Sequence, residues 1–69
     1  MRNRHYIRLH DSYTNEVMKF GLSEINYIEP YNGGCTVSTW DDGDYDVMED
    51  YETVENMVHE AQFYTYEEV

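Results

Sequence analysis

The stretch Cys35–Glu49, CTVSTWDDGDYDVME, decides the fold because it reads as a β-hairpin. Two segments rich in strand-forming residues flank the polar turn DDG at positions 41–43. We therefore expect strands over about 35–40 and 44–49. Gly43 should adopt the left-handed conformation that closes a turn of this kind, because glycine reaches it without steric cost.

This turn also predicts which side chains share a face, because successive residues of a strand point to opposite sides. The expected register places Thr39 opposite Tyr45 and Val37 opposite Val47. These four residues and Cys35 would form the core face. The other face would be acidic and would carry an indole, with Ser38, Trp40, Asp44, Asp46 and Met48 as its members.

The residues after the hairpin change to helical spacing. We expect a helix over about 51–63 that covers the core face of the hairpin, and a tail over 64–69. Asp50 is suited to cap the amino end of this helix, and Glu52 and Glu55 complement the positive end of its dipole. The apolar positions of the helix are Tyr51, Val54, Met57, Val58 and Ala61.

The residues before the hairpin supply the remaining strands. Alternation around Ile7 and Leu9 predicts a half-buried strand over about 5–10, which would form a hairpin with a second strand over about 16–20. A third strand is expected over about 25–29. The chain thus reads as a single α+β domain, a small antiparallel sheet of four to five strands packed by one C-terminal helix.

The charge distribution is the strongest indication of function. The net charge is −11, and of the 15 acidic residues only Asp11 and Glu16 precede Phe20. All of the lysines and arginines lie within the first 19 positions, namely Arg2, Arg4, Arg8 and Lys19. So much uncompensated negative charge repels phosphates, which argues against direct binding to nucleic acid or to an anionic membrane. A basic protein surface is the expected partner, and the exposed aromatic residues leave a homodimer open.

Several classes of protein are disfavoured by what the sequence lacks. Cys35 is the single cysteine, which excludes an internal disulfide and a cysteine zinc cluster and suits a reducing cytoplasm. We find no signal peptide or membrane span, so a cytoplasmic location is expected, in the host cell if the gene belongs to a phage. A chain of this size buries only about 60% of its unfolded surface, which disfavours a large catalytic cleft.

Metal and catalytic sites are not expected. His5 and His10 would lie on opposite faces of one strand, and His59 lies on the helix. The acidic run from Asp41 does not match a calcium loop, because Gly43 is in the wrong place. The sequence contains no nucleophile elbow or phosphate-binding glycine loop, so we expect no enzyme and no cofactor.

The expected binding surface is a rigid negative patch formed by the hairpin tip, the outer hairpin face and the start of the helix. Its carboxylates would be Asp41, Asp42, Asp44, Asp46, Glu49, Asp50, Glu52 and Glu55. Trp40 and Tyr45 would add apolar anchoring, because aromatic residues commonly anchor protein interfaces. The alternative is that these acidic residues only keep the protein soluble. The missing counter-charges favour binding, because surfaces selected for solubility usually mix both signs.

Part of the chain resembles the small FlbD-like family, over about positions 6–58. The matching segments are IRLH (Ile7–His10), GLSEINYIEP (Gly21–Pro30), CTVSTW, DDGD, YDVMED and ETVENMV. The resemblance implies two β-hairpins and a terminal helix and carries no catalytic residues. The acidic second strand of the hairpin and the residues after Met57 depart from that family.

In size and charge the chain is also similar to phage-encoded inhibitors, including anti-CRISPR proteins and other DNA mimics. We therefore expect a small acidic inhibitor, encoded by a phage or mobile element. It would block a nucleic-acid-binding protein such as a CRISPR effector by placing carboxylates where DNA phosphates bind. The alternative is a structural or regulatory adaptor of the FlbD-like kind, which would bind a protein partner through a sheet edge or its aromatic surface.

Overall fold

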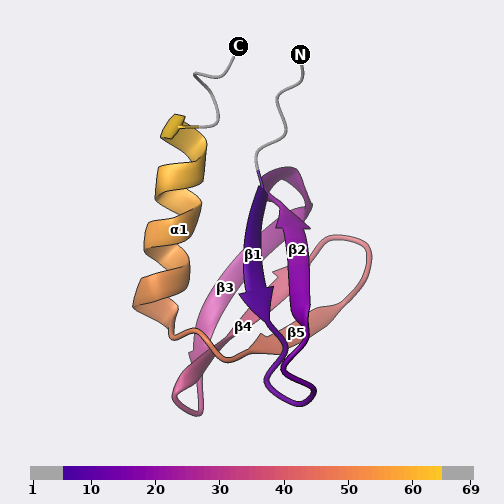
Figure 1. Ribbon diagram of the computed structural model, residues 1–69. Coiled ribbons are helices and arrows are strands. Elements are labelled where there is room, and N and C mark those ends of the chain that lie inside the picture. The colour runs from indigo at the N-terminus through magenta and orange to yellow at the C-terminus, as the bar shows by residue number, and fades with distance from the viewer. Residues whose placement is uncertain (1–5, 65–69) are drawn as a thin grey trace.

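The computed structural model describes the backbone of residues 6–64 and the side chains of residues 6–62. It consists of five strands and one C-terminal helix (Figure 1). The α+β fold class is confirmed. Residues 65–69 of the expected tail, and His5 of the first expected strand, lie outside the described residues. In chain order the elements are β1 (Tyr6–His10), β2 (Val17–Gly21), a 3₁₀ turn (Leu22–Glu24), β3 (Ile25–Tyr31), β4 (Gly34–Thr39), β5 (Asp44–Val47) and α1 (Tyr51–Tyr64).

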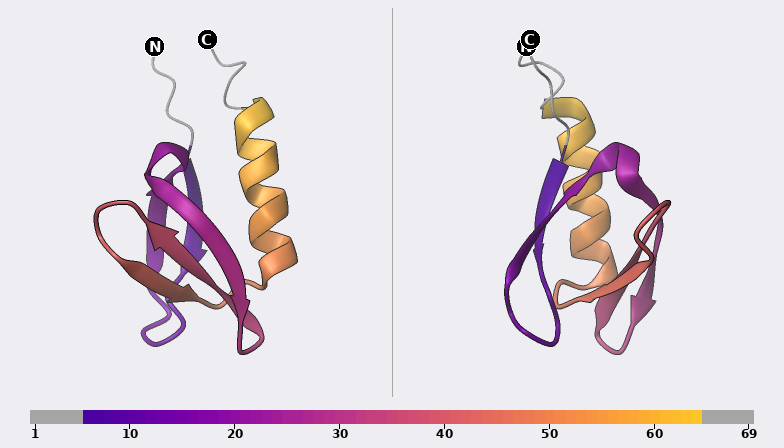
Figure 2. Two further views of the ribbon diagram at one scale, coloured as in Figure 1. Left: turned by 180° about the vertical axis from the view of Figure 1, so that it is seen from behind. Right: turned by 90° about the vertical axis from the view of Figure 1, so that its right-hand side faces the viewer.

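The strands are divided between two antiparallel sheets rather than joined in one. β1 pairs with β2, and β3, β4 and β5 form the second sheet in that order. Figure 2 shows the two sheets facing each other, with α1 closing the space between them on one side. A seam joins the sheets where an isolated bridge pairs Asp11 with Val47. At this seam Met48 N–H donates to the His10 carbonyl at 2.9 Å, and Ser12 N–H donates to the Asp46 carbonyl at 3.0 Å.

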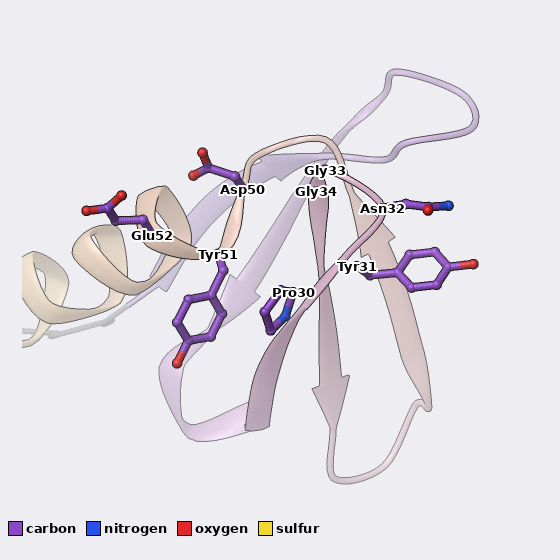
Figure 3. Close-up of a pocket in the computed structure, with 8 residues that line it drawn as sticks. All are labelled: Pro30, Tyr31, Asn32, Gly33, Gly34, Asp50, Tyr51 and Glu52. Carbon is purple, nitrogen blue, oxygen red and sulfur yellow. The ribbon is translucent and has the colours of Figure 1, made fainter.

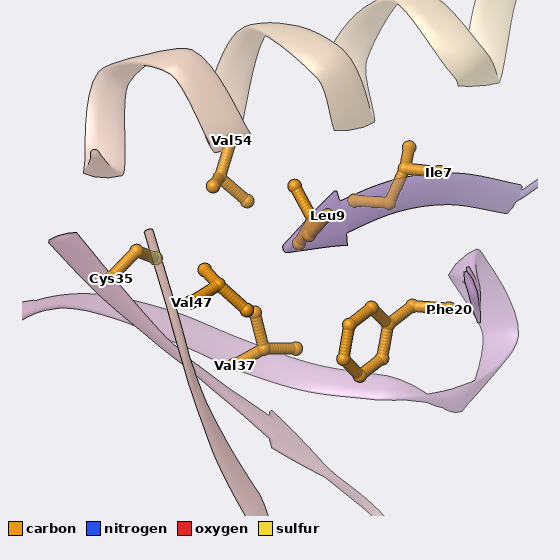
Figure 4. Packing of buried hydrophobic residues seen from close by; sticks show 7 residues of the cluster. All are labelled: Ile7, Leu9, Phe20, Cys35, Val37, Val47 and Val54. Atoms are coloured by element: carbon orange, nitrogen blue, oxygen red, sulfur yellow. The ribbon is translucent and has the colours of Figure 1, made fainter. Parts of the chain in front are cut away.

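The core lies where both sheets and the helix meet (Figure 4). Leu9, Val37 and Val54 are fully buried, one from each of these three parts. The remaining buried apolar members are Ile7, Phe20, Cys35 and Val47. Partly buried side chains of α1 extend this core along the helix, as its apolar spacing predicts; they are Tyr51, Met57, Val58 and Ala61.

The register of the β4–β5 hairpin differs from the expected one by two residues. Val37 pairs with Tyr45, and the ladder ends where Thr39 N–H donates to the Gly43 carbonyl at 2.9 Å. Gly43 has the expected positive φ of 89°. It lies opposite Thr39, and the Thr39 hydroxyl also donates to the Gly43 carbonyl, at 2.7 Å. A shift of two residues keeps every side chain on its expected face, since the strand period is two.

The β3–β4 turn brings three strands unusually close together. Asn32 and Gly33 both have positive φ values, 49° and 82°, as a two-residue type I′ turn requires. The next residue, Gly34, lies against the end of β5, where a Cβ atom would overlap the Val47 carbonyl oxygen. The turn therefore requires glycine at position 34 for space rather than for backbone conformation.

We expect Gly34→Ala to lower the free energy of unfolding by roughly 1–3 kcal/mol, the usual cost of forcing extra volume into a packed site. Gly21→Ala is the matched control, because a Cβ there would meet only ordinary contacts of 3.5 Å with the Glu24 side chain. Urea denaturation of both variants measures the difference. Equal stabilities for the two would contradict the close approach of Gly34 to Val47.

Candidate functional site

The expected acidic patch is separated into two groups. Asp41, Asp42 and Asp44 are exposed at the β4–β5 turn, while Glu52 and Glu55 are exposed on the first turns of α1. β5 lies between them, and all views in Figures 1 and 2 place the β4–β5 turn and the start of α1 at opposite ends of that strand. The hairpin tip and the helix start therefore lie at opposite ends of β5.

Asp46 and Glu49 serve the seam between the sheets. The Asp46 carboxylate accepts hydrogen bonds from the Thr36 hydroxyl at 2.8 Å and from the Tyr13 hydroxyl at 3.0 Å. The Glu49 carboxylate accepts the backbone N–H of His10 at 3.0 Å and lies 2.8 Å from Nδ1 of the same residue. Asp46 therefore connects β5 to Tyr13 on the β1–β2 turn. Glu49, in the segment that follows β5, connects that segment to His10 of β1.

The pKa of Glu49 reflects this arrangement. Partial burial alone would raise the pKa of its carboxyl, but the hydrogen bonds from the His10 ring and backbone outweigh burial and leave the pKa below its usual value. Because its side chain is only 19% exposed, water competes weakly for these bonds. Glu49 is therefore an ionised residue that helps to hold the fold together.

Asp50 caps α1, as the sequence predicts. Its carboxylate accepts the N–H of Thr53 at 2.9 Å, and this hydrogen bonding lowers the pKa of Asp50. The open hollow of about 510 Å³ beside it, shown in Figure 3, is also lined by Pro30, Tyr51 and Glu52. The two carboxylates at its rim repel anions, so this helix start does not resemble a phosphate site.

The two expected aromatic anchors have different environments. Tyr45 lies half-buried against the core, where its ring meets Phe20 edge-on with centroids 5.5 Å apart. Trp40 is 65% exposed at the hairpin tip, and its backbone N–H donates to the Glu24 carbonyl at 3.1 Å. Of the two, only Trp40 is available at the surface.

The described cations do not neutralise the carboxylates. Arg8 and Lys19 are cross-strand partners on the β1–β2 hairpin. Both lie over the ring of Tyr6, with their charged groups 5.7 and 4.8 Å from its centroid. Within residues 6–64, the one salt bridge is that between His10 and Glu49. Among residues 6–64, the exposed carboxylates therefore have no lysine or arginine partner.

Sequence reasoning missed one group of surface residues. β3 continues to Tyr31 rather than ending near position 29, so Tyr27, Glu29 and Tyr31 all point away from the core. The signal was present in the dipeptide Asn32-Gly33, which is typical of a two-residue hairpin turn and sets the end of the preceding strand at Tyr31. Tyr13, which lies on the β1–β2 turn, joins this surface through its hydrogen bond to Asp46.

Comparison with known proteins gives no match for this chain. No family model matches it, and neither curated proteins nor solved structures yield a significant match. In the described part of the chain, no group of histidine, cysteine or acidic side chains could hold a metal ion. No helix there is long and apolar enough to cross a membrane.

We expect Glu49→Gln to reduce the free energy of unfolding by about 1–3 kcal/mol at neutral pH, because it removes a charged acceptor of two hydrogen bonds. The pKa of Glu49 is lower in the folded protein than in the unfolded chain. Its contribution to stability is therefore complete above the unfolded-state pKa and is lost as the pH falls through the folded-state pKa. The difference between wild type and variant should therefore shrink as acid is added.

Urea denaturation across pH measures this difference. Glu16→Gln is the matched control, because Glu16 is exposed and no hydrogen bond to its carboxylate is seen. A Glu49→Gln deficit that stays constant down to acid pH, or one no larger than that of the control, would contradict the role assigned to this carboxylate.

Proposed function

We propose that the protein is a small acidic inhibitor that occupies the basic surface of a nucleic-acid-binding protein. In this proposal carboxylates take the place of phosphates, and the partner can no longer bind its nucleic acid. A CRISPR effector is one partner of this kind, and the site of action is the cytoplasm. The observation that carries the proposal is that Arg8 and Lys19, the two described basic residues, lie over Tyr6, so that within residues 6–64 the exposed carboxylates have no lysine or arginine partner.

The hairpin tip supplies the leading contact in this proposal. Asp41 and Asp42 lie in a turn whose shape is set by Thr39, because the threonine hydroxyl accepts the Asp42 N–H at 3.0 Å and donates to Gly43. A preorganised turn loses little entropy on binding. Exposed Trp40 beside these carboxylates adds an apolar anchor of a type that is common in protein interfaces.

A second candidate is an adaptor that binds through its aromatic surface or a sheet edge. Exposed Tyr27 and Tyr31 on β3 favour it, as does the free edge of that strand, which pairs only with β4 in residues 6–64. The two functions differ in salt dependence, because screening weakens contacts between charges and leaves apolar contacts largely unchanged.

The test is retention of proteins from a host lysate on the immobilised chain. We expect the retained proteins to bind nucleic acid, to elute with added duplex DNA, and to lose about tenfold or more in affinity between about 0.05 and 0.2 M salt. Retention that resists both salt and DNA would contradict mimicry and favour the adaptor.

Substitutions at the tip give an independent check. We expect Asp41→Asn/Asp42→Asn to weaken binding of the captured partner by at least about tenfold, as losing contacts to charged groups commonly does. Glu52→Gln/Glu55→Gln on α1 is the control with the same change in net charge. Equal losses for the two double variants would show that net charge, rather than the tip, controls binding.

A further inference from the structure

The outward surface of the three-stranded sheet is aromatic and has no partner in the described structure. Residues of β4 alternate, so that Cys35 and Val37 face the core while Thr36 and Ser38 lie on the opposite side of the sheet, where they are only 9% and 6% exposed. The surface formed by this side of the sheet is called the outer sheet face, and its members besides β4 are Tyr13, Tyr27, Glu29, Tyr31, Asp44 and Asp46. The tyrosines at positions 13, 27 and 31 are 77%, 49% and 51% exposed.

The strand order places two chemically different strands, β3 and β5, on either side of β4. Tyr27 and Asp44 both pair with Ser38, from opposite sides of β4, and Glu29 and Asp46 both pair with Thr36. β3 and β5 are two strand spacings apart, roughly 9–10 Å. On this side of the sheet, the small residues of β4 therefore lie between β3, which carries tyrosines, and β5, which carries carboxylates.

Hydrogen bonds hold one end of this face in place. Asp46 accepts from both Thr36 and Tyr13, which positions the Tyr13 ring beside β5, and the same hydrogen bond raises the pKa of Tyr13. Figure 3 shows the ring of Tyr31 directed away from α1. Tyr31 is thus presented to solvent by β3, and Tyr13, which lies on the β1–β2 turn, is held beside β5 by its hydrogen bond to Asp46.

The charge of the face selects a cationic occupant. Glu29, Asp44 and Asp46 contribute three carboxylates, and neither β3, β4, β5 nor the described β1–β2 turn contributes a lysine or arginine. Arg8 and Lys19 lie on the separate β1–β2 surface with Tyr6. An anionic ligand would be repelled, and a neutral one would leave these carboxylates without a counter-charge.

We propose that the outer sheet face is the docking site for an arginine-bearing extended segment of the protein's partner. A guanidinium group can stack flat on a tyrosine ring while its N–H groups reach a carboxylate, whereas an ammonium group lacks both the plane and the fork. This inference rests on the proposed function, a basic partner, and adds the contact surface and the residue type that it recognises.

The test uses labelled arginine–glycine and lysine–glycine repeat peptides of equal length at low salt, with a glutamine–glycine repeat as the uncharged reference. We expect the arginine peptide to bind about threefold or more tightly than the lysine peptide, because stacking on the rings adds to the attraction between charges. Amide NMR shifts of the chain should change mainly along β3, β5 and the β1–β2 turn.

Two double variants separate the contributions. Tyr27→Leu/Tyr31→Leu keeps apolar bulk but removes the rings, so the preference for arginine should disappear while the lysine peptide binds as before. Glu29→Gln/Asp44→Asn should weaken both peptides more than the matched control Glu52→Gln/Glu55→Gln. Circular dichroism and thermal unfolding of each variant confirm that the sheet is intact before binding is compared.

The outcomes also separate this inference from the proposed function. Equal binding of the arginine and lysine peptides, or NMR shifts confined to the hairpin tip or to α1, would overturn the inference and leave an acidic inhibitor of a basic partner intact. If no cationic peptide binds more tightly than the glutamine peptide, both the inference and the proposed function are wrong.

Discussion

Repulsion among unneutralised carboxylates is the constraint that the rest of the structure must satisfy. A net charge of −11 on 69 residues opposes compaction, and the described cations lie over a tyrosine ring rather than beside a carboxylate. The fold is held against this repulsion by one core shared between two small sheets and a helix. Neither sheet could bury its apolar face alone, so the seam between β1 and the end of β5 is essential.

The carboxylates have two different roles. Asp46, Glu49 and Asp50 accept hydrogen bonds that hold the seam and the helix start. For Asp46 and Glu49 these contacts explain why an acidic residue occurs at a partly buried position. The carboxylates of the hairpin tip and the outer helix remain in solvent. Function is therefore to be sought among the second group and on the outer sheet face, where exposed tyrosines lie beside Glu29 and Asp44.

The sequence predicts the features that depend on local periodicity, and these include the α+β class, the cap at Asp50, the left-handed Gly43 and the two faces of the central hairpin. Features set by long-range contacts could not be predicted. The way in which the two sheets are joined depends on the Asp11–Val47 bridge, which pairs positions far apart in the chain. The hairpin register depends on the Thr39 hydroxyl, and the separation of the acidic groups depends on the direction of β5. The tyrosine surface of β3 was missed because the expected third strand ends near position 29, short of Tyr31 and the Asn32-Gly33 turn.

The claim that the exposed carboxylates of residues 6–64 lack a lysine or arginine partner is tested most directly by the salt dependence of stability. If these carboxylates mainly repel one another, the midpoint of thermal unfolding should rise steadily as sodium chloride is added, because screening relieves the repulsion in the folded state. A midpoint that falls with added salt would contradict the claim, since it would mean that attractive ion pairs, and not repulsion, dominate the electrostatics of the folded protein.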